Sequence, residues 1–141
     1  MFREDYLIRM FKQFAEAIAA LAGLRRAGKH EEALAAADRI HGELLTAPRE
    51  MTDLLDTPAL AQLLGRPDKM RAAAMLYWEE GNIYRAKGDA LTAHLRFKRA
   101  FELVLEARAI EPSPDDDGAI LELARLVPAR DLDPRYRAAD V

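Results

Sequence analysis

The side chains in this sequence that are best suited to hold a metal ion are three histidines and one acidic run. The histidines lie on separate predicted helices: His30, His41 and His94. None has a second histidine three or four positions away, so the paired ligands of a helical zinc site are missing. In the acidic run, a calcium loop with its glycine at Gly118 would begin at Ser113 and end at Ala124, where Asp and Glu are required. We therefore expect no metal and no other cofactor, and we assign the acidic run to helix capping.

Arrangements that would support catalysis are also missing from the sequence. It has no glycine-rich phosphate loop, no nucleophile elbow and no Glu-x-x-His pair to assemble a nucleophile, a base and an oxyanion site. Glu79 and Glu80 are neighbouring carboxylates, but adjacent positions on a helix diverge by about 100° and do not share a site. We expect these two side chains to be solvent or edge charges, and we expect the protein not to be an enzyme.

One stretch carries side chains suited to recognising another molecule. Met75, Trp78, Asn82 and Arg85 recur at intervals of three and four, which places them on one face if the stretch is helical. Tryptophan is enriched at binding hot spots. The alternative is that Trp78 is a core residue packed against the first helix of the chain.

This face belongs to a predicted helical hairpin that spans residues 74–105. Two stripes of residues at helical spacing face each other: Tyr77, Gly81 and Tyr84 on the first helix, and Ala93, Phe97 and Ala100 on the second. Gly88 supplies the left-handed conformation that ends the first helix, and Asp89 caps the second. Gly81 costs roughly 1 kcal/mol of helix propensity relative to Ala, which close packing of the two helices must offset.

The spacing Tyr77-x2-Glu80-Gly81-x2-Tyr84, followed by Ala93-x3-Phe97 and Ala100, resembles the tetratricopeptide repeat (TPR). The sequence departs from the repeat where Glu80 replaces Leu, Tyr77 replaces Trp, and Leu105 replaces the Pro that ends the second helix. Residues 28–34 repeat the turn in a degenerate form. Over about residues 2–110, the segments FREDY, GKHEEAL and EEGNIY also look like a family of uncharacterised bacterial TPR-like proteins.

The resemblance implies an all-α fold of TPR-like antiparallel hairpins that acts as an interaction scaffold. It implies that the face described above lines a concave groove, in which Trp78 is an anchor, Asn82 bonds to a peptide backbone or carboxylate and Arg85 pairs with an acid. We predict a non-catalytic protein–protein interaction module, an adaptor or scaffold subunit with an unidentified protein or peptide partner. The alternatives are a homo-oligomeric structural protein and a regulator that binds a small ligand or peptide in the groove.

Composition narrows the class of protein. Half of the 141 residues are hydrophobic, there is no cysteine, and the formal net charge is −3. Mixed charge of this kind creates no field that attracts nucleic acid or an anionic membrane. No apolar run approaches the roughly 20 residues that span a bilayer, and charges at positions 3, 4, 5 and 9 interrupt any signal peptide. We expect a cytoplasmic protein that binds neither nucleic acid nor membrane.

The periodicity and the positions of Gly and Pro predict five main helices, at about 4–26, 30–45, 67–84, 89–109 and 116–126. An insertion at about 46–69 separates two hairpins and contains short helices, one of them capped by Thr57. Residues 1–110 form the TPR-like domain, and 111–141 form a C-terminal helix with a loosely held tail beyond residue 130. The expected core residues are Phe11, Phe14, Ile18, Leu21, Ile40, Tyr77, Gly81, Tyr84, Phe97 and Phe101.

The first helix carries more apolar surface than one neighbouring helix covers. Phe2, Tyr6 and Met10 form a second stripe beside its core stripe. Stacked repeats generally need three or more units, whereas this chain offers two hairpins. We therefore predict a homodimer that buries this stripe; the alternative is a monomer whose last helix folds back over it.

Overall fold

The computed structural model describes residues 2–137, with side chains from Glu4 onward. This part of the chain contains eight α-helices, one 3-10 helix and no strand: α1 (Phe2–Arg26), α2 (His30–Leu45), α3 (Arg49–Thr52), α4 (Thr57–Leu64), α5 (Pro67–Lys87), α6 (Ala90–Ile110), α7 (Asp116–Leu126), η1 (Ala129–Asp131) and α8 (Pro134–Arg137). The predicted all-α class is confirmed. The expected five main helices and short insertion helices are present, and η1 and α8 are additional. None of the helices within residues 2–137 is long and apolar enough to cross a membrane.

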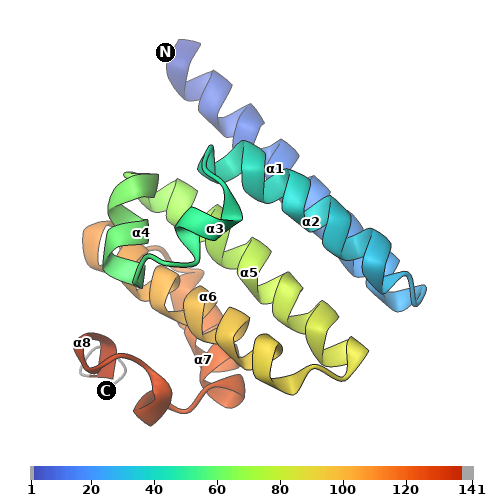
Figure 1. Cartoon of the computed structure of the whole chain (residues 1–141). Helices are drawn as coiled ribbons and strands as arrows, with labels where there is room; N and C mark the ends of the chain where they lie inside the picture. The colour runs from blue at the N-terminus through green and yellow to red at the C-terminus, as the bar shows by residue number, and fades with distance from the viewer. Residues whose placement is uncertain (1, 138–141) are drawn as a thin grey trace.

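The long helices are arranged around α5. Helices α1 and α2 lie side by side and both pack against α5, while α6 runs back along α5 in the opposite direction and carries α7 (Figure 1). The first turns of α1 extend beyond the rest of the molecule (Figure 1). Eight of the ten expected core residues are buried, and the other two, Phe11 and Tyr84, are partly buried against the core.

The turn between α5 and α6 forms as its residues predict. Gly88 adopts a left-handed conformation with φ of 89°, and the Asp89 carboxylate accepts a 3.1 Å hydrogen bond from the Thr92 N–H. Inside the helix pair, a methyl group placed on Gly81 would lie 2.5 Å from Cδ1 of Phe97. The helices therefore approach each other at a position where only glycine fits without movement of the ring.

The insertion folds into α3 and α4, with one correction to the predicted cap. Asp56, not Thr57, is the N-cap of α4, and its carboxylate accepts a 2.9 Å bond from the Ala59 N–H. The Thr57 hydroxyl instead donates to Glu102 at 2.6 Å, and Thr57 is buried. An aspartate at this position caps as well as threonine does, so the local pattern did not distinguish the two residues.

The C-terminal segment is more ordered than predicted. Leu132 and Tyr136 are buried, and the Tyr136 hydroxyl donates a 2.6 Å hydrogen bond to Glu106 on α6. The expectation of a loosely held tail is therefore wrong for residues 130–137, because two apolar side chains pack against the helices before them. Residues 138–141 lie outside the described part of the chain.

Helix α7 begins at the acidic run, but the capping differs in detail from the prediction. Asp115 occupies the cap position without a side-chain cap bond. Asp116 accepts hydrogen bonds from Arg71 at 3.0 and 2.8 Å and from the Ser113 N–H at 2.8 Å. Burial opposes ionisation of Asp116, but these bonds outweigh it and lower the pKa of its carboxyl. The acidic run therefore ties α7 to α5.

Candidate functional site

A shallow groove runs between α1 and α5 and is bordered by α7. It has a volume of about 390 Å³ and brings three of the four predicted partner-binding residues together: Met75, Trp78 and Asn82. Ala15, Ile18 and Ala19 on α1 form the opposite wall, and Glu122 on α7 closes one edge. The groove exists because small side chains on α1 leave space beside the larger side chains of α5.

Trp78 is neither fully buried in the core nor fully exposed. Its side chain packs partly against the core, yet it remains half-buried and lines the groove. Met75, one turn before it, is 44% exposed. Two large apolar side chains are thus incompletely covered by the chain itself, which is the surface that a partner can use.

Arg85, the fourth predicted residue, is not part of the groove wall. Its Nη2 donates to Oδ1 of Asn82 at 3.3 Å, and its guanidinium lies 5.5 Å from the centre of the Phe97 ring. The Arg85 side chain is exposed to solvent. Its first role in the fold is to orient Asn82 and to cover Phe97.

One residue that lines the groove, Glu79, is held in an ion pair. Glu79 is buried and accepts hydrogen bonds from Arg25 at 2.7 and 3.4 Å. This pairing contradicts the expectation that Glu79 is a solvent or edge charge. With Glu79 neutralised, Glu122 is the carboxylate that the groove presents at its edge.

The predicted self-association residues lie at the projecting end of α1. Tyr6 is 59% exposed and Met10 is partly buried, and together with Arg9 and Gln13 they line a small surface hollow. The side chain of Phe2 lies outside the described part of the structure. Ile8, on the same part of the helix, is 66% exposed, so this end of α1 presents uncovered apolar surface.

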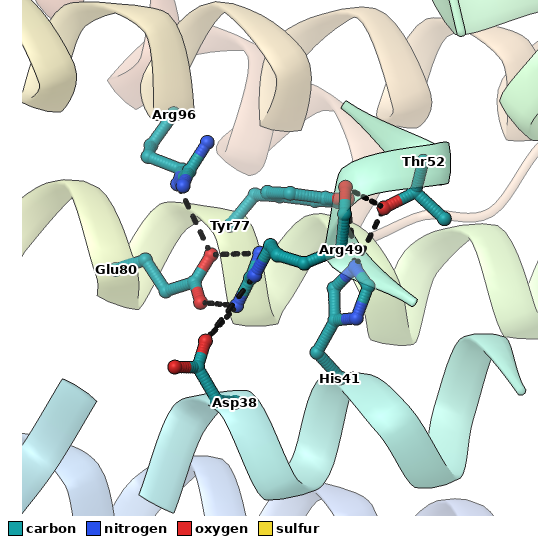
Figure 2. A network of polar contacts seen from close by, with 7 residues as sticks. All are labelled: Asp38, His41, Arg49, Thr52, Tyr77, Glu80 and Arg96. Atoms are coloured by element: carbon teal, nitrogen blue, oxygen red, sulfur yellow. Dashed lines mark hydrogen bonds and ion pairs between the residues drawn. The ribbon is translucent and has the colours of Figure 1, made fainter. Parts of the chain in front are cut away.

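A buried polar network was missed at the sequence level. Glu80 is 1% exposed, and Figure 2 shows its carboxylate between Arg49 and Arg96. Arg49 donates to both Glu80 oxygens, and its Nη2 also donates to Asp38 at 2.9 Å. Nε of Arg96 lies 3.4 Å from Glu80. The network joins α2, α3, α5 and α6, so the expectation that Glu80 is a solvent or edge charge is wrong.

Burial and charge act in opposite directions on this network. Removal from water raises the pKa of Glu80, and the Arg49 and Arg96 guanidinium groups oppose that rise. Burial disfavours the charge of Arg49, but the Glu80 carboxylate outweighs it and raises the pKa of Arg49. Since Arg49 is charged at every physiological pH, an ionised Glu80 is the state that leaves no unpaired charge in the core.

His41 lies at the edge of the same network. Its Nε2 is 3.2 Å from the Thr52 hydroxyl and 3.4 Å from the Tyr77 hydroxyl (Figure 2). Burial, followed by the positive charge of Arg49, lowers the pKa of His41 to about 4. His41 is therefore neutral at pH 7 and serves as a hydrogen-bonding residue of the core.

The network joins four helices around a carboxylate that is closed to solvent. Glu80 is enclosed, and its two oxygens are both used by arginines, so a substrate has no access to it. Within residues 2–137, no group of three or more His, Cys, Asp or Glu side chains is placed to hold a metal ion. One sequence signal could have revealed Glu80: it lies three residues after Tyr77 and four before Tyr84, within the core stripe.

Comparison of the chain with protein-family models, with curated proteins and with solved structures found no match to any of them.

Proposed function

We propose that this protein is a non-catalytic interaction module whose α1–α5 groove binds a segment of a partner protein. The observation that carries this proposal is the pair of incompletely covered side chains, Met75 and Trp78, facing the small residues Ala15 and Ala19 across the groove. A partner segment with one apolar side chain fits between these walls. Glu122 at the edge favours a Lys or Arg next to that apolar residue, because opposite charges across an interface complement each other.

We further infer that the two helical hairpins are TPR-like and that the protein is an adaptor or scaffold subunit in the cytoplasm. The fit of Phe97 against Gly81 and the Gly88–Asp89 turn support the TPR-like hairpin. The cysteine-free sequence supports a reducing compartment. Asn82 supplies the hydrogen bond to the partner backbone, and Arg85 assists by holding the Asn82 amide in place.

The test is capture of a partner from native cell lysate by the full chain and by matched variants. Trp78→Ala removes the aromatic wall, and Met75→Glu places a charge in the groove at a position that is 44% exposed. Both should abolish capture of the same partner. Leu91→Ala is the control, since Leu91 is 72% exposed on α6, away from the groove residues. Capture of the partner by both groove variants would show that the groove is not the binding surface.

Self-association is the second candidate function, and the exposed apolar end of α1 favours it. Tyr6 and Ile8 are 59% and 66% exposed on turns that project beyond the rest of the molecule (Figure 1). Pairing of two copies about a two-fold axis would bury the same surface on both. A homodimer of this kind is compatible with partner binding, because the groove residues lie further along α1.

A further inference from the structure

A second surface that is open to a partner lies where the segment between α3 and α4 meets α6. Three leucines there are uncovered: Leu54 is 87% exposed, Leu91 is 72% exposed and Leu95 is 52% exposed. Leu91 and Leu95 lie one turn apart on α6, so they share a face. Leu95 and Asp53, the residue before Leu54, line one cavity of about 340 Å³, which we call the α6 cavity. The uncovered leucines therefore border this cavity or lie one helical turn from it.

The α6 cavity is separate from the α1–α5 groove. The two share no lining residue, and α5 contributes Tyr77 to the cavity but Met75, Trp78, Glu79 and Asn82 to the groove. At 3.6 residues per turn, Tyr77 and Asn82 point about 140° apart on the helix. The cavity and the groove therefore lie on different sides of α5.

Carboxylates outnumber cations in the lining of the α6 cavity. The lining contains four carboxylates and three cations: Asp53, Asp56, Glu102 and Asp133 against Arg96, Lys98 and Arg99. Arg96 also lies 3.4 Å from Glu80, a carboxylate outside the lining. Lys98 lies 3.1 Å from Asp133 and 3.9 Å from Glu102. The cavity therefore carries a surplus of negative charge, which favours a cation over an anion.

The charge that a partner would meet first is negative. Asp53 and Asp56 are exposed, and no cation in residues 4–137 lies within ion-pair distance of either carboxylate. The side chains of Arg96 and Lys98 are only 18% and 26% exposed, and Arg99 is half-buried. The mouth of the cavity therefore presents leucine side chains beside carboxylates that no cation of the described chain pairs.

We propose that this surface docks a linear segment of a partner protein in which a Lys or Arg stands next to an apolar side chain. The apolar side chain packs on Leu54 and Leu95, which the chain itself leaves uncovered. The cation meets Asp53 and Asp56, because complementary charge across an interface selects the partner. The proposal goes beyond the function assigned to the groove: the protein holds two partners at once, one on each side of α5.

The test is an NMR titration of the isotope-labelled full chain at low salt with a capped hexapeptide of alternating leucine and lysine. We expect saturable shifts of the amide signals of residues 53–57 and 91–99. A peptide with glutamate in place of lysine loses the charge contacts, and one with serine in place of leucine loses the apolar contacts. Each should bind at least about fivefold more weakly at residues 53–57 and 91–99.

A double variant tests the two carboxylates directly. Asp53→Asn with Asp56→Asn removes both charges and keeps the side-chain shapes, and Asn caps a helix as well as Asp does, so α4 keeps its cap. Binding of the leucine–lysine peptide should weaken by about three- to tenfold. Asp115→Asn with Asp117→Asn is the matched control, since both residues are exposed at the start of α7, and it should bind as the wild type does. Far-UV circular dichroism checks that each variant is folded.

Failure of this proposal can be told apart from failure of the groove proposal. Trp78→Ala changes only the groove, so the shifts at residues 53–57 and 91–99 should persist in that variant. Shifts confined to residues 75–82 would overturn the docking surface at the α6 cavity and leave the groove proposal standing. Equal affinity for the lysine and glutamate peptides, or equal affinity in the two double variants, would also overturn it.

Discussion

Phe97 on α6 lies so close to Gly81 on α5 that a single added methyl group would overlap its ring. Gly81→Ala gains up to about 1 kcal/mol of helix propensity, whereas overpacking of a buried site typically costs about 1 to 3 kcal/mol. We therefore expect Gly81→Ala to lower the free energy of unfolding. Urea denaturation of the two proteins measures the difference.

Gly23→Ala provides the matched control for this prediction. Gly23 also lies within a helix, but a methyl group there would meet no atom within 4 Å. It should stabilise the protein by about 0.5 to 1 kcal/mol. Stabilisation by both alanines would show that the contact between Gly81 and Phe97 is looser than described.

The network around Glu80 predicts a large effect from a small change in side chain. Glu80→Gln keeps the shape but leaves Arg49 and Arg96 in the core without their carboxylate. Removal of one partner of a buried ion pair costs about 3 to 5 kcal/mol. Thermal and urea unfolding should both show this loss.

Asp38→Asn tests the second carboxylate that contacts Arg49, which is exposed to solvent. The Asp38 side chain is 67% exposed, so its bond to Arg49 is screened by water, and we expect a change within about 1 kcal/mol. Similar losses in Glu80→Gln and Asp38→Asn would contradict the conclusion that the enclosed carboxylate holds the helices together.

His41 predicts a dependence of stability on pH. Its ordinary pKa of 6.5 falls to about 4 in the folded protein. The unfolded chain therefore binds more protons between these values, so the contribution is fully present above pH 6.5 and is lost as the pH falls towards 4. The slope from one such group is at most about 1.4 kcal/mol per pH unit.

Unfolding free energies of the wild type and of His41→Asn, measured at intervals from pH 7 to pH 4, isolate this contribution. The variant cannot titrate at this position, so its stability should decline less steeply than that of the wild type between pH 6.5 and 5. Parallel curves for the two proteins in that interval would argue against a depressed pKa for His41. Carboxyl groups titrate mainly below this pH interval, so they contribute little to the difference between the two curves.

The projecting end of α1 predicts the oligomeric state. We expect light scattering at micromolar concentration to give a dimeric mass, and Met10→Lys to give a monomeric mass, since a charge in the paired apolar stripe is costly to bury. Leu121→Lys is the control, because Leu121 is 60% exposed on α7 and should leave the dimer intact. A monomeric wild-type mass would show that the stripe is not an interface.

The sequence alone determined the five main helices and most of their ends. Gly88 and Asp89 act on the backbone next to them, so their turn followed from residue type. Gly81 lies within the core stripe of its helix, and a helix repeats its faces at a fixed period. Its position therefore predicted a close helix contact. The face of Met75, Trp78 and Asn82 was predictable for the same reason.

Tertiary structure decided which distant segments meet. Arg49 comes from the insertion, and only its approach to α5 turns Glu80 from an apparent surface charge into a buried ionic contact. The Tyr136 hydroxyl donates to Glu106, which lies 30 positions earlier in the chain. No local sequence pattern predicts a contact over this separation. Arg99 lines a cavity that forms where α6, the start of α4 and the C-terminal segment converge. Ion pairs and cavities depend on these long-range approaches, whereas caps and helix faces depend on neighbours within one or two turns.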